Sequence, residues 1–397
     1  MLEYPELSAK VCKSVKPGTV LPIVRDNVIV TSGETMDSGR SIAWTDMQNK
    51  YSIMDNWTDN PQPGRAVIPR DLFINSPRAE FLINGDTLNW GLNGSQVQVP
   101  VTDYSEYPLT ELIWSANHPD KCYVDWTELL PALKWLKTAV SKSKDRRPAL
   151  ENILLTTSGT KVVLVATDGH VLKKVNFNTG SIPDSGSNIN FFLNPGIVKF
   201  LLSIPPQALD RVTFAGDTTT DLFAVSGLFT VNSPYTNSGV PRFLIESERN
   251  TDGLKYPDYD QVIPKDRTTY PFYINEVRDA IKQIKPAIPK ESGRVVLDFD
   301  REQVGVLKFG ADIGDYAAAA DIKRLFDIPG QSPIRCTPSL ERIAFNHVLF
   351  DTVMPKTADD PVLAGFDKDC NAIVFESTGV VTWGDKYYAL LMPLKNR

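Results

Sequence analysis

The feature that most constrains this chain is a repeat, because the same order of elements occurs three times along its 397 residues. Each copy contains an amphipathic helix, a pair of strands, a second helix and further strands, in roughly 120 residues or more. A chain of this length is also too long for one ordinary hydrophobic core. The sequence therefore predicts an α+β protein of three repeated domains, at residues 1–120, 121–265 and 266–397.

The helix that opens each copy is recognised by apolar residues at helical spacing. In the middle copy these residues are Leu129, Leu133, Leu136 and Val140. Pro131 is expected in the first turn of this helix, where a missing N–H costs little. The three opening helices are predicted at 5–16, 125–144 and 273–285.

The second helix of each copy is predicted from a proline or a capping residue that follows a strand. Asn194-Pro195 and Thr337-Pro338 each supply an N-cap residue and then proline at the first helical position. The strand-to-helix segments are predicted at 66–73, 191–202 and 334–345. Alternating or β-branched residues predict strands at 27–33, 152–169, 211–216, 223–233, 294–300 and 387–394.

Composition and motif spacing narrow the class of protein. The longest apolar stretches, such as 162–166, are far too short to cross a membrane, and the N-terminus lacks the apolar core of a signal peptide. Four dispersed cysteines without CxxC spacing are typical of a reducing compartment. Three histidines without HxxxH spacing predict no zinc site. We therefore expect a cytoplasmic protein with no membrane partner, no metal and no cofactor.

Basic residues gather on the three opening helices, although the net charge is −6. Lys10, Lys13 and Lys16 follow i, i+3, i+6 spacing, which places them along one helical face. On one helix such a stripe is usually a solvated face, but its repetition in three copies indicates one positive surface. Three repeats around an axis would turn these stripes toward a lumen suited to sequence-independent contact with a polyanion. The other members are Lys134, Lys137, Lys142, Lys144, Arg278, Lys282 and Lys285.

The stretch LVATDGHVL (164–172) admits two interpretations. Asp168 and His170 would form an acid–base pair if the protein were a hydrolase. Alternatively, Thr167, Asp168 and Gly169 end a strand in a tight turn, with Gly169 supplying backbone freedom. A hydrolase would also need a nucleophile elbow or a metal cluster, and the sequence has neither GxSxG nor paired histidines. We therefore expect a turn and no enzymatic activity.

Four fragments, in order along the chain, carry a resemblance to a known family. They are RRPALENILL (146–155), LVATDGHVL (164–172), YPDYDQVIP (256–264) and YYALLMPLKNR (387–397). With these fragments and its threefold repeat, the chain resembles the bacterial DNA polymerase III beta subunit, which is the beta sliding clamp. Its divergence is compatible with a member encoded by a phage or a plasmid.

The resemblance implies the DNA clamp fold. In this family two three-domain subunits form a head-to-tail homodimer and a pseudo-sixfold ring, with helices lining the channel and sheets outside. The ring encircles double-stranded DNA without reading its sequence, and it is a processivity factor without catalytic residues. DNA polymerase and the clamp loader bind the ring through short linear motifs.

The resemblance further implies a peptide-binding pocket between the middle and last domains. Methionine and leucine side chains adapt such a pocket to varied peptides, and polar groups at its rim orient them. For Leu150, Leu172 and Leu390, an ordinary core position is the alternative. The pocket residues carried over are Arg147, Leu150, Thr167, Gly169, His170, Leu172, Pro257, Gln261, Val262, Leu390, Met392, Pro393, Leu394 and Lys395.

Two other hypotheses stay open beside the replicative clamp. One is a clamp-fold protein that binds partners without being a replicative ring, such as a monomeric or decoy clamp. Its mass in solution would distinguish it from a dimeric ring. The other is the hydrolase with Asp168 and His170 in its site.

Overall fold

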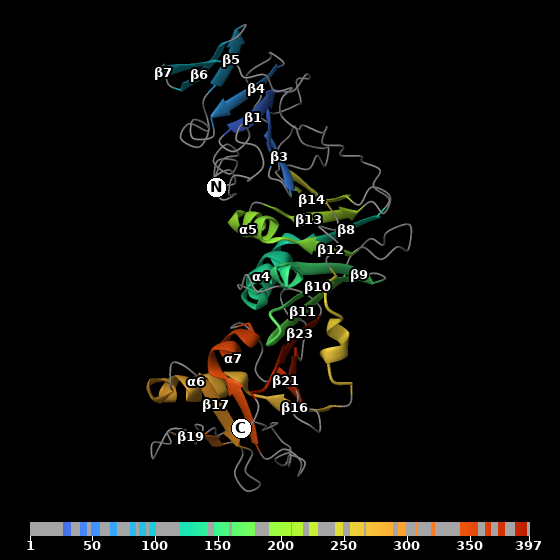
Figure 1. Cartoon of the computed structure of the whole chain (residues 1–397), viewed down its shortest axis with the longest axis vertical. Helices are drawn as coiled ribbons and strands as arrows, with labels where there is room; N and C mark the ends of the chain where they lie inside the picture. The colour runs from blue at the N-terminus through green and yellow to red at the C-terminus, as the bar shows by residue number, and fades with distance from the viewer. Residues whose placement is uncertain are drawn as a thin grey trace. The chain divides into compact units, whose positions relative to one another are not determined.

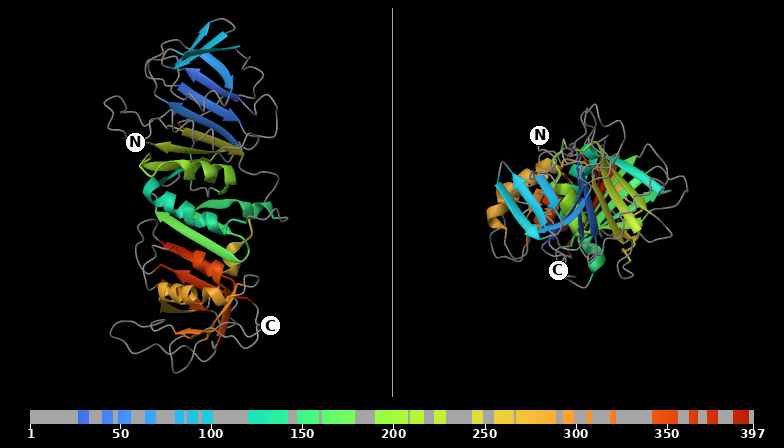
Figure 2. Two further views of the ribbon diagram at one scale, coloured as in Figure 1. Left: turned by 90° about the vertical axis from the view of Figure 1, so that its left-hand side faces the viewer. Right: turned by 90° about the horizontal axis from the view of Figure 1, so that it is seen from above.

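The computed structural model contains both helices and sheets, as the α+β class requires (Figures 1 and 2). The helix predicted at 5–16 lies outside the residues that it describes. The described residues are 27–32, 40–45, 49–55, 64–69, 80–84, 87–92, 95–100, 120–141, 147–158, 161–178, 190–207, 209–216, 222–228, 243–248, 255–265, 267–288, 293–298, 306–308, 319–321, 342–355, 362–366, 372–377 and 386–394.

The chain divides into two compact units, each assembled from separate segments. The first unit contains Met1–Leu130, Leu155–Val162 and Thr179–Leu254. The second unit contains Pro131–Leu154, Val163–Asn178 and Lys255–Arg397. The division into three domains at 1–120, 121–265 and 266–397 stays a prediction.

The first unit contains an eight-stranded sheet in which every neighbouring pair is antiparallel. Its order is β4 (Gly64–Pro69), β1 (Asn27–Ser32), β2 (Arg40–Thr45), β3 (Asn49–Asp55), β15 (Phe243–Glu248), β14 (Leu222–Leu228), β13 (Arg211–Gly216) and β8 (Asp120–Asp125). Because β15 pairs with β3, one sheet continues from the predicted first domain into the predicted middle domain. A three-stranded meander consists of β5 (Glu80–Asn84), β6 (Thr87–Leu92) and β7 (Ser95–Pro100).

A second eight-stranded sheet provides most strands of the second unit. Its order is β12 (Asn190–Leu193), β9 (Ile153–Ser158), β10 (Lys161–Thr167), β11 (Val171–Asn178), β23 (Lys386–Leu391), β22 (Ile373–Glu376), β21 (Val362–Phe366) and β16 (Thr268–Phe272). The antiparallel pairing of β11 with β23 joins the predicted middle and last domains. A four-stranded sheet has the order β19 (Ala319–Asp321), β18 (Val306–Lys308), β17 (Arg294–Asp298) and β20 (Arg342–Asn346).

The opening helices of the middle and last copies are confirmed in place, but the middle one was predicted to reach residue 144 and ends at Ala139, with Val140 extended. They are α4 (Trp126–Leu136), continued by η2 (Lys137–Ala139), and α6 (Ile274–Ile284), continued by η5 (Lys285–Ala287). Pro131 lies inside α4 rather than in its first turn, so the prediction for this residue was wrong. A proline at this depth removes one i→i−4 hydrogen bond from the helix. Two further 3-10 turns are η3 (Pro148–Glu151) and η4 (Tyr259–Val262).

The second helix of the middle copy begins where the sequence predicts. The side chain of Asn194 accepts a hydrogen bond from the N–H of Ile197 at 3.0 Å, and Pro195 is the first residue of α5 (Pro195–Ser203). This arrangement satisfies one of the main-chain donors that every helix leaves unpaired at its start.

The second helix of the last copy begins later than predicted. Arg342–Asn346 forms the strand β20, which pairs with β17, and the helix α7 spans His347–Val353. The side chain of Asn346 caps this helix by accepting from the N–H groups of Val348 and Leu349. The expectation of a helix across residues 342–345 was therefore wrong, because these residues pair with β17. The predicted helix start at Thr337-Pro338 lies outside the described residues.

The core around α7 is aromatic. Phe350 of α7 stacks on Phe345 at a ring distance of 4.8 Å and meets Phe375 edge-on at 5.9 Å. Phe272 meets Phe375 edge-on at 5.6 Å, and all four rings are buried. These contacts connect α7 to strands of both sheets in the second unit.

Gly365 of β21 leaves room for the side chain of Arg267 to cross the sheet. A Cβ built on Gly365 would lie 2.6 Å from Cδ of Arg267. Arg267 forms an ion pair with Glu376 of β22 and donates to the carbonyl of Pro264 at 2.7 Å. Because both ends of its guanidinium are engaged, the side chain has little freedom to move aside.

We therefore expect Gly365→Ala to lower the free energy of unfolding by about 1–3 kcal/mol, as overpacking usually does. Urea denaturation of the single variants and of the Gly365→Ala, Arg267→Ala double variant measures this effect. If the clash with Arg267 is the cause, the glycine substitution costs less when Arg267 is already alanine. Equal costs in both backgrounds would contradict this account.

Candidate functional site

The candidate site lies in the second unit, where β11 pairs with β23. Leu172 lies opposite Leu390 in the register of the two strands. Beyond the end of β23, the N–H of Met392 donates to the carbonyl of His170 at 2.9 Å, and the N–H of Leu394 donates to the carbonyl of Ala344 at 2.8 Å. The C-terminal segment 392–394 is therefore held by main-chain hydrogen bonds on two sides.

The predicted pocket residues differ in exposure. Leu150, Leu172 and Leu390 are each only 2–3% exposed, so they occupy core positions. Met392, Pro393 and Leu394 are half-buried, and Thr167 is buried. Val262 is 48% exposed, and Arg147, Gly169, His170, Pro257 and Gln261 are also exposed. Lys395 lies outside the described residues.

Asp168 organises the turn between β10 and β11. Its Oδ1 accepts hydrogen bonds from the N–H groups of His170 and Val171, both at 2.8 Å. The hydroxyl oxygen of Thr167 accepts from the N–H of Gly169 at 3.1 Å, and Gly169 has a φ of 90° that L side chains rarely adopt. The carboxylate thus binds the main chain of its own turn, as in other Asx turns. This arrangement supports the turn interpretation over an acid–base pair.

Arg147 lies against the same turn. Its Nη1 is 3.6 Å from the position that a Cβ on Gly169 would take. The guanidinium is exposed, so it is available at the edge of the site as a hydrogen-bond donor and a positive charge.

The segment 255–267 is anchored to strands of the second unit at three points. The hydroxyl of Tyr256 donates to the carbonyl of Val165 on β10 at 3.4 Å. Lys174 of β11 pairs with Asp260 at 3.3 Å and lies 5.0 Å from the ring centroid of Tyr259. The third anchor is the ion pair between Arg267 and Glu376 described above. These contacts hold Pro257, Gln261 and Val262 in place.

Tyr256 and Lys174 are positioning residues that the sequence analysis missed. Burial raises the pKa of both Tyr256 and its neighbour Tyr259, the latter to about 12. Both phenols are therefore neutral at physiological pH, and the ring of Tyr259 faces the ammonium of Lys174 as an uncharged aromatic group. The available signal was the aromatic residue directly before Pro257, at the start of the fragment 256–264.

No protein-family model matches the sequence, and no curated protein matches it. Solved structures do match it over nearly the whole chain. The Helicobacter pylori beta clamp in complex with diflunisal is 13% identical with a TM-score of 0.75, and the match covers 98% of this chain and 97% of that one. The chain has the DNA clamp fold.

Two more structures with the clamp fold give the same result. The DNA polymerase sliding clamp from Bacillus subtilis is 15% identical with a TM-score of 0.72, and the match covers 100% of this chain and 98% of that one. The Helicobacter pylori beta clamp bound to a DNA ligase peptide is 13% identical with a TM-score of 0.71, at 98% and 97% coverage. The predicted fold is thus confirmed, at a sequence identity of only 13–15%.

The basic residues predicted for the inner surface of this clamp fold are in part exposed. Lys134, Lys137, Lys282 and Lys285 are exposed. Arg278 is only 6% exposed, and its guanidinium donates to main-chain carbonyls of its own chain. Its expected place in an exposed stripe was therefore wrong, because the end of α7 covers it. Lys10, Lys13, Lys16, Lys142 and Lys144 lie outside the described residues.

No cluster of three or more His, Cys, Asp or Glu side chains among the described residues has a geometry that could hold a metal ion. Within the same residues, no helix combines the length and apolar character that a membrane crossing requires.

We expect Asp168→Ala to lower the free energy of unfolding by about 1–3 kcal/mol, because two main-chain N–H groups lose their acceptor. Asp168→Asn keeps a side-chain oxygen in the same position, so its effect should be less than about half as large. Urea denaturation of both variants measures the difference. Equal destabilisation by Asn and Ala would show that the negative charge, rather than the turn, is what Asp168 provides.

Proposed function

We propose that this protein is a DNA sliding clamp, a cytoplasmic processivity factor that encircles double-stranded DNA without sequence specificity. The observation that carries the proposal is the match to bacterial clamps over 98–100% of the chain. A chain of three repeated domains supplies half of a pseudo-sixfold ring. Two identical chains in a closed symmetric arrangement would complete it. The function needs no catalytic step, because a closed ring stays on DNA by its topology.

We infer that partner proteins bind at the surface formed by Val262 and the segment 392–394, which we call the peptide surface. The Helicobacter pylori beta clamp has been solved bound to a DNA ligase peptide. In this chain, an exposed valine and half-buried Met392, Pro393 and Leu394 support a similar role toward motifs of DNA polymerase and the clamp loader. Exposed Arg147, His170 and Gln261 would orient the peptide at the rim.

The expected affinity follows from the size of these contacts. Full burial of an apolar side chain contributes roughly 1.5–3 kcal/mol. Ordering the peptide and losing its translational freedom offset much of this gain. Two or three such contacts therefore lead us to expect micromolar binding.

We predict that Met392→Ala with Val262→Ala weakens binding of a peptide carrying glutamine followed by leucine and phenylalanine by at least about tenfold, from lost apolar burial. Isothermal titration calorimetry measures the affinity. Alanine at Met392 keeps the main-chain hydrogen bond to His170, so the fold should be retained.

Val348→Ala is the matched control, because this valine is 57% exposed on α7, outside the proposed surface. It should leave peptide affinity unchanged, and His170→Ala should have a much smaller effect than the double variant. An equal loss in the Val348 variant, or no loss in the double variant, would place the partner site elsewhere.

The proposed DNA contacts are electrostatic. Exposed lysines on α4, η2, α6 and η5 would bind phosphate groups rather than bases, so binding should be weak, sequence-independent and sensitive to salt. Arg278 has no part in this proposal, because its guanidinium is occupied within the chain.

We predict that Lys134→Glu with Lys282→Glu abolishes stable loading onto circular DNA, because two phosphate contacts become repulsive. Gel filtration of the loaded complex measures retention, and light scattering should still give twice the chain mass of 44.1 kDa. Lys161→Glu with Lys265→Glu makes the same change of net charge at exposed positions outside these helices and should load normally. Equal loss in both double variants would indicate a general charge effect, and a monomeric mass would favour the non-replicative alternative.

A further inference from the structure

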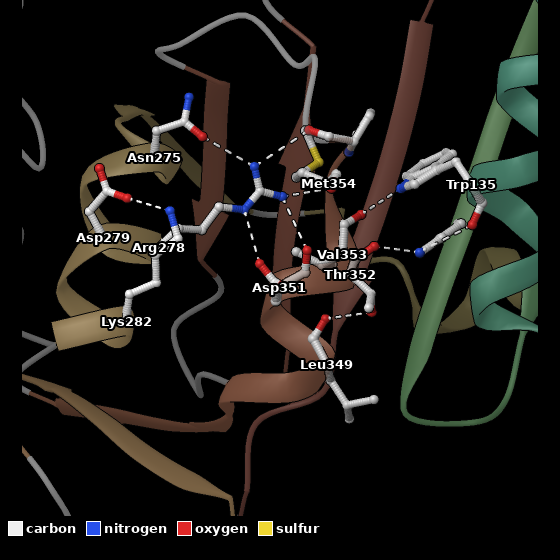
Figure 3. A network of polar contacts seen from close by, with 12 residues as sticks. Trp135, Asn275, Arg278, Asp279, Lys282, Leu349, Asp351, Thr352, Val353 and Met354 are labelled. Atoms are coloured by element: carbon white, nitrogen blue, oxygen red, sulfur yellow. Dashed lines mark hydrogen bonds and ion pairs between the residues drawn. The ribbon is translucent and has the colours of Figure 1, made fainter. Parts of the chain in front are cut away.

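The C-terminus of α7 is held by side chains from other elements of the second unit (Figure 3). The helix ends at Val353, and the backbone of Met354 is extended. The last carbonyl groups of α7 therefore have no donor from a further helical turn. From α4, the indole of Trp135 donates to the carbonyl of Val353 at 3.2 Å. From α6, on the opposite side in Figure 3, Arg278 donates to the carbonyls of Asp351 at 3.3 Å and Met354 at 2.7 Å.

Lys173 of β11 provides a third donor, and its side chain is fully buried. Its Nζ donates to the carbonyl of Thr352 and to the hydroxyl of Thr138, both at 2.5 Å, and to the carbonyl of Trp135 at 3.3 Å. The ammonium also lies 5.1 Å from the centroid of the Trp135 ring. A lysine is almost never fully buried without such partners.

Trp135, Lys173 and Arg278, with the carbonyl groups of residues 351–354, form what we call the α7 joint. Asp351 lies 3.8 Å from Nε of Arg278 but is 54% exposed. Asp168, in the turn before β11, acts on Lys173 from a longer distance. From β23, the ring of Tyr387 meets the indole of the joint edge-on at 5.7 Å.

These surroundings determine how readily Lys173 holds its proton. Burial lowers the pKa of Lys173 from 10.5 to about 7, because the charged amine loses its hydration. The smaller effects oppose one another, since Asp168 raises this pKa and the positive charge of Arg278 lowers it.

We propose that the α7 joint is a proton-sensitive connection between the predicted middle and last domains. With Lys173 charged, two cations share one buried helix end, and the joint opens more readily. With Lys173 neutral, Arg278 is the one remaining cation of the joint, and the joint stays closed. The proposal does not depend on the DNA-binding and peptide-binding functions proposed above.

The sign of the pH dependence follows from proton linkage. An opened joint exposes Lys173 to water, where its pKa returns toward 10.5. Between about pH 7 and 10.5 the open state binds more protons than the closed state, so opening becomes less favourable as the pH rises. Below about pH 7 both states carry the proton, and this dependence ends.

Hydrogen exchange of the full-length protein, followed by mass spectrometry, tests the proposal. The readout is the protection factor of residues 347–355 after correction for the intrinsic exchange rate at each pH. From pH 7 to pH 9 we expect protection to rise about ten- to hundredfold, since each pH unit between the two pKa values changes the opening constant up to tenfold. Residues 211–216 of the first unit should show no such rise and serve as the internal control.

Three variants assign the effect to Lys173. Lys173→Met should give protection that does not vary with pH, because the titrating group is gone. Lys173→Arg stays charged throughout this range and should keep α7 weakly protected at every pH. Lys265→Met removes a positive charge from an exposed position of the same unit and should keep the wild-type change of protection with pH.

Two outcomes would overturn the proposal. One is a wild-type protection factor of residues 347–355 that does not change from pH 7 to pH 9. This result would contradict the proposal even if a variant fails to fold. The other is a wild-type rise that persists unchanged in Lys173→Met, because the titrating group would then be a different one.

Discussion

The candidate site depends on the pairing of β11 with β23. The two strands come from distant parts of the chain, so loop-closure entropy opposes their meeting and apolar burial must offset it. Leu172 and Leu390, directly opposite and almost fully buried, contribute roughly 1.5–3 kcal/mol each. The register then brings the N–H of Met392 to the carbonyl of His170 and leaves the segment 392–394 half-buried. A slip of one residue would exchange the two faces of β23 and remove the proposed peptide surface.

Local signals in the sequence predict the features that depend on a few neighbouring residues. Asn194-Pro195 predicts the start of α5, and residues 167–169 predict a tight turn, because capping and positive φ belong to short segments. The start of α7 is different, because it depends on pairing with another strand. Residues 342–345 pair with β17, so the helix begins only after Asn346. The hydrogen bond from the hydroxyl of Tyr256 to the carbonyl of Val165 is not predicted by any local signal, because the two residues are 91 positions apart in the sequence.

Helical spacing predicts which residues share a face, but it does not predict what covers that face. Arg278, Lys282 and Lys285 have the spacing of one stripe on α6. The structure leaves the two lysines exposed and buries the arginine under the end of α7. A cation at a helix C-terminus is balanced by the helix dipole and by the carbonyls it binds. Counting charges from the sequence therefore overestimates the exposed positive surface of α6, and it misses that Lys173 has no exposed surface.

The end of α7 explains why these cations are buried. Many helices satisfy their last carbonyl groups with a glycine in the left-handed conformation, but here Met354 is extended and Pro355 has no N–H to donate. Val353, Met354 and Pro355 are buried, so the carbonyl groups must find donors within the protein. Charged donors form the stronger hydrogen bonds and complement the helix dipole, although their desolvation opposes the gain. Arg278 keeps its charge under all ordinary conditions. Lys173 can lose its charge near neutral pH, so a helix end closed in this way becomes sensitive to protons as a direct consequence of how it is capped.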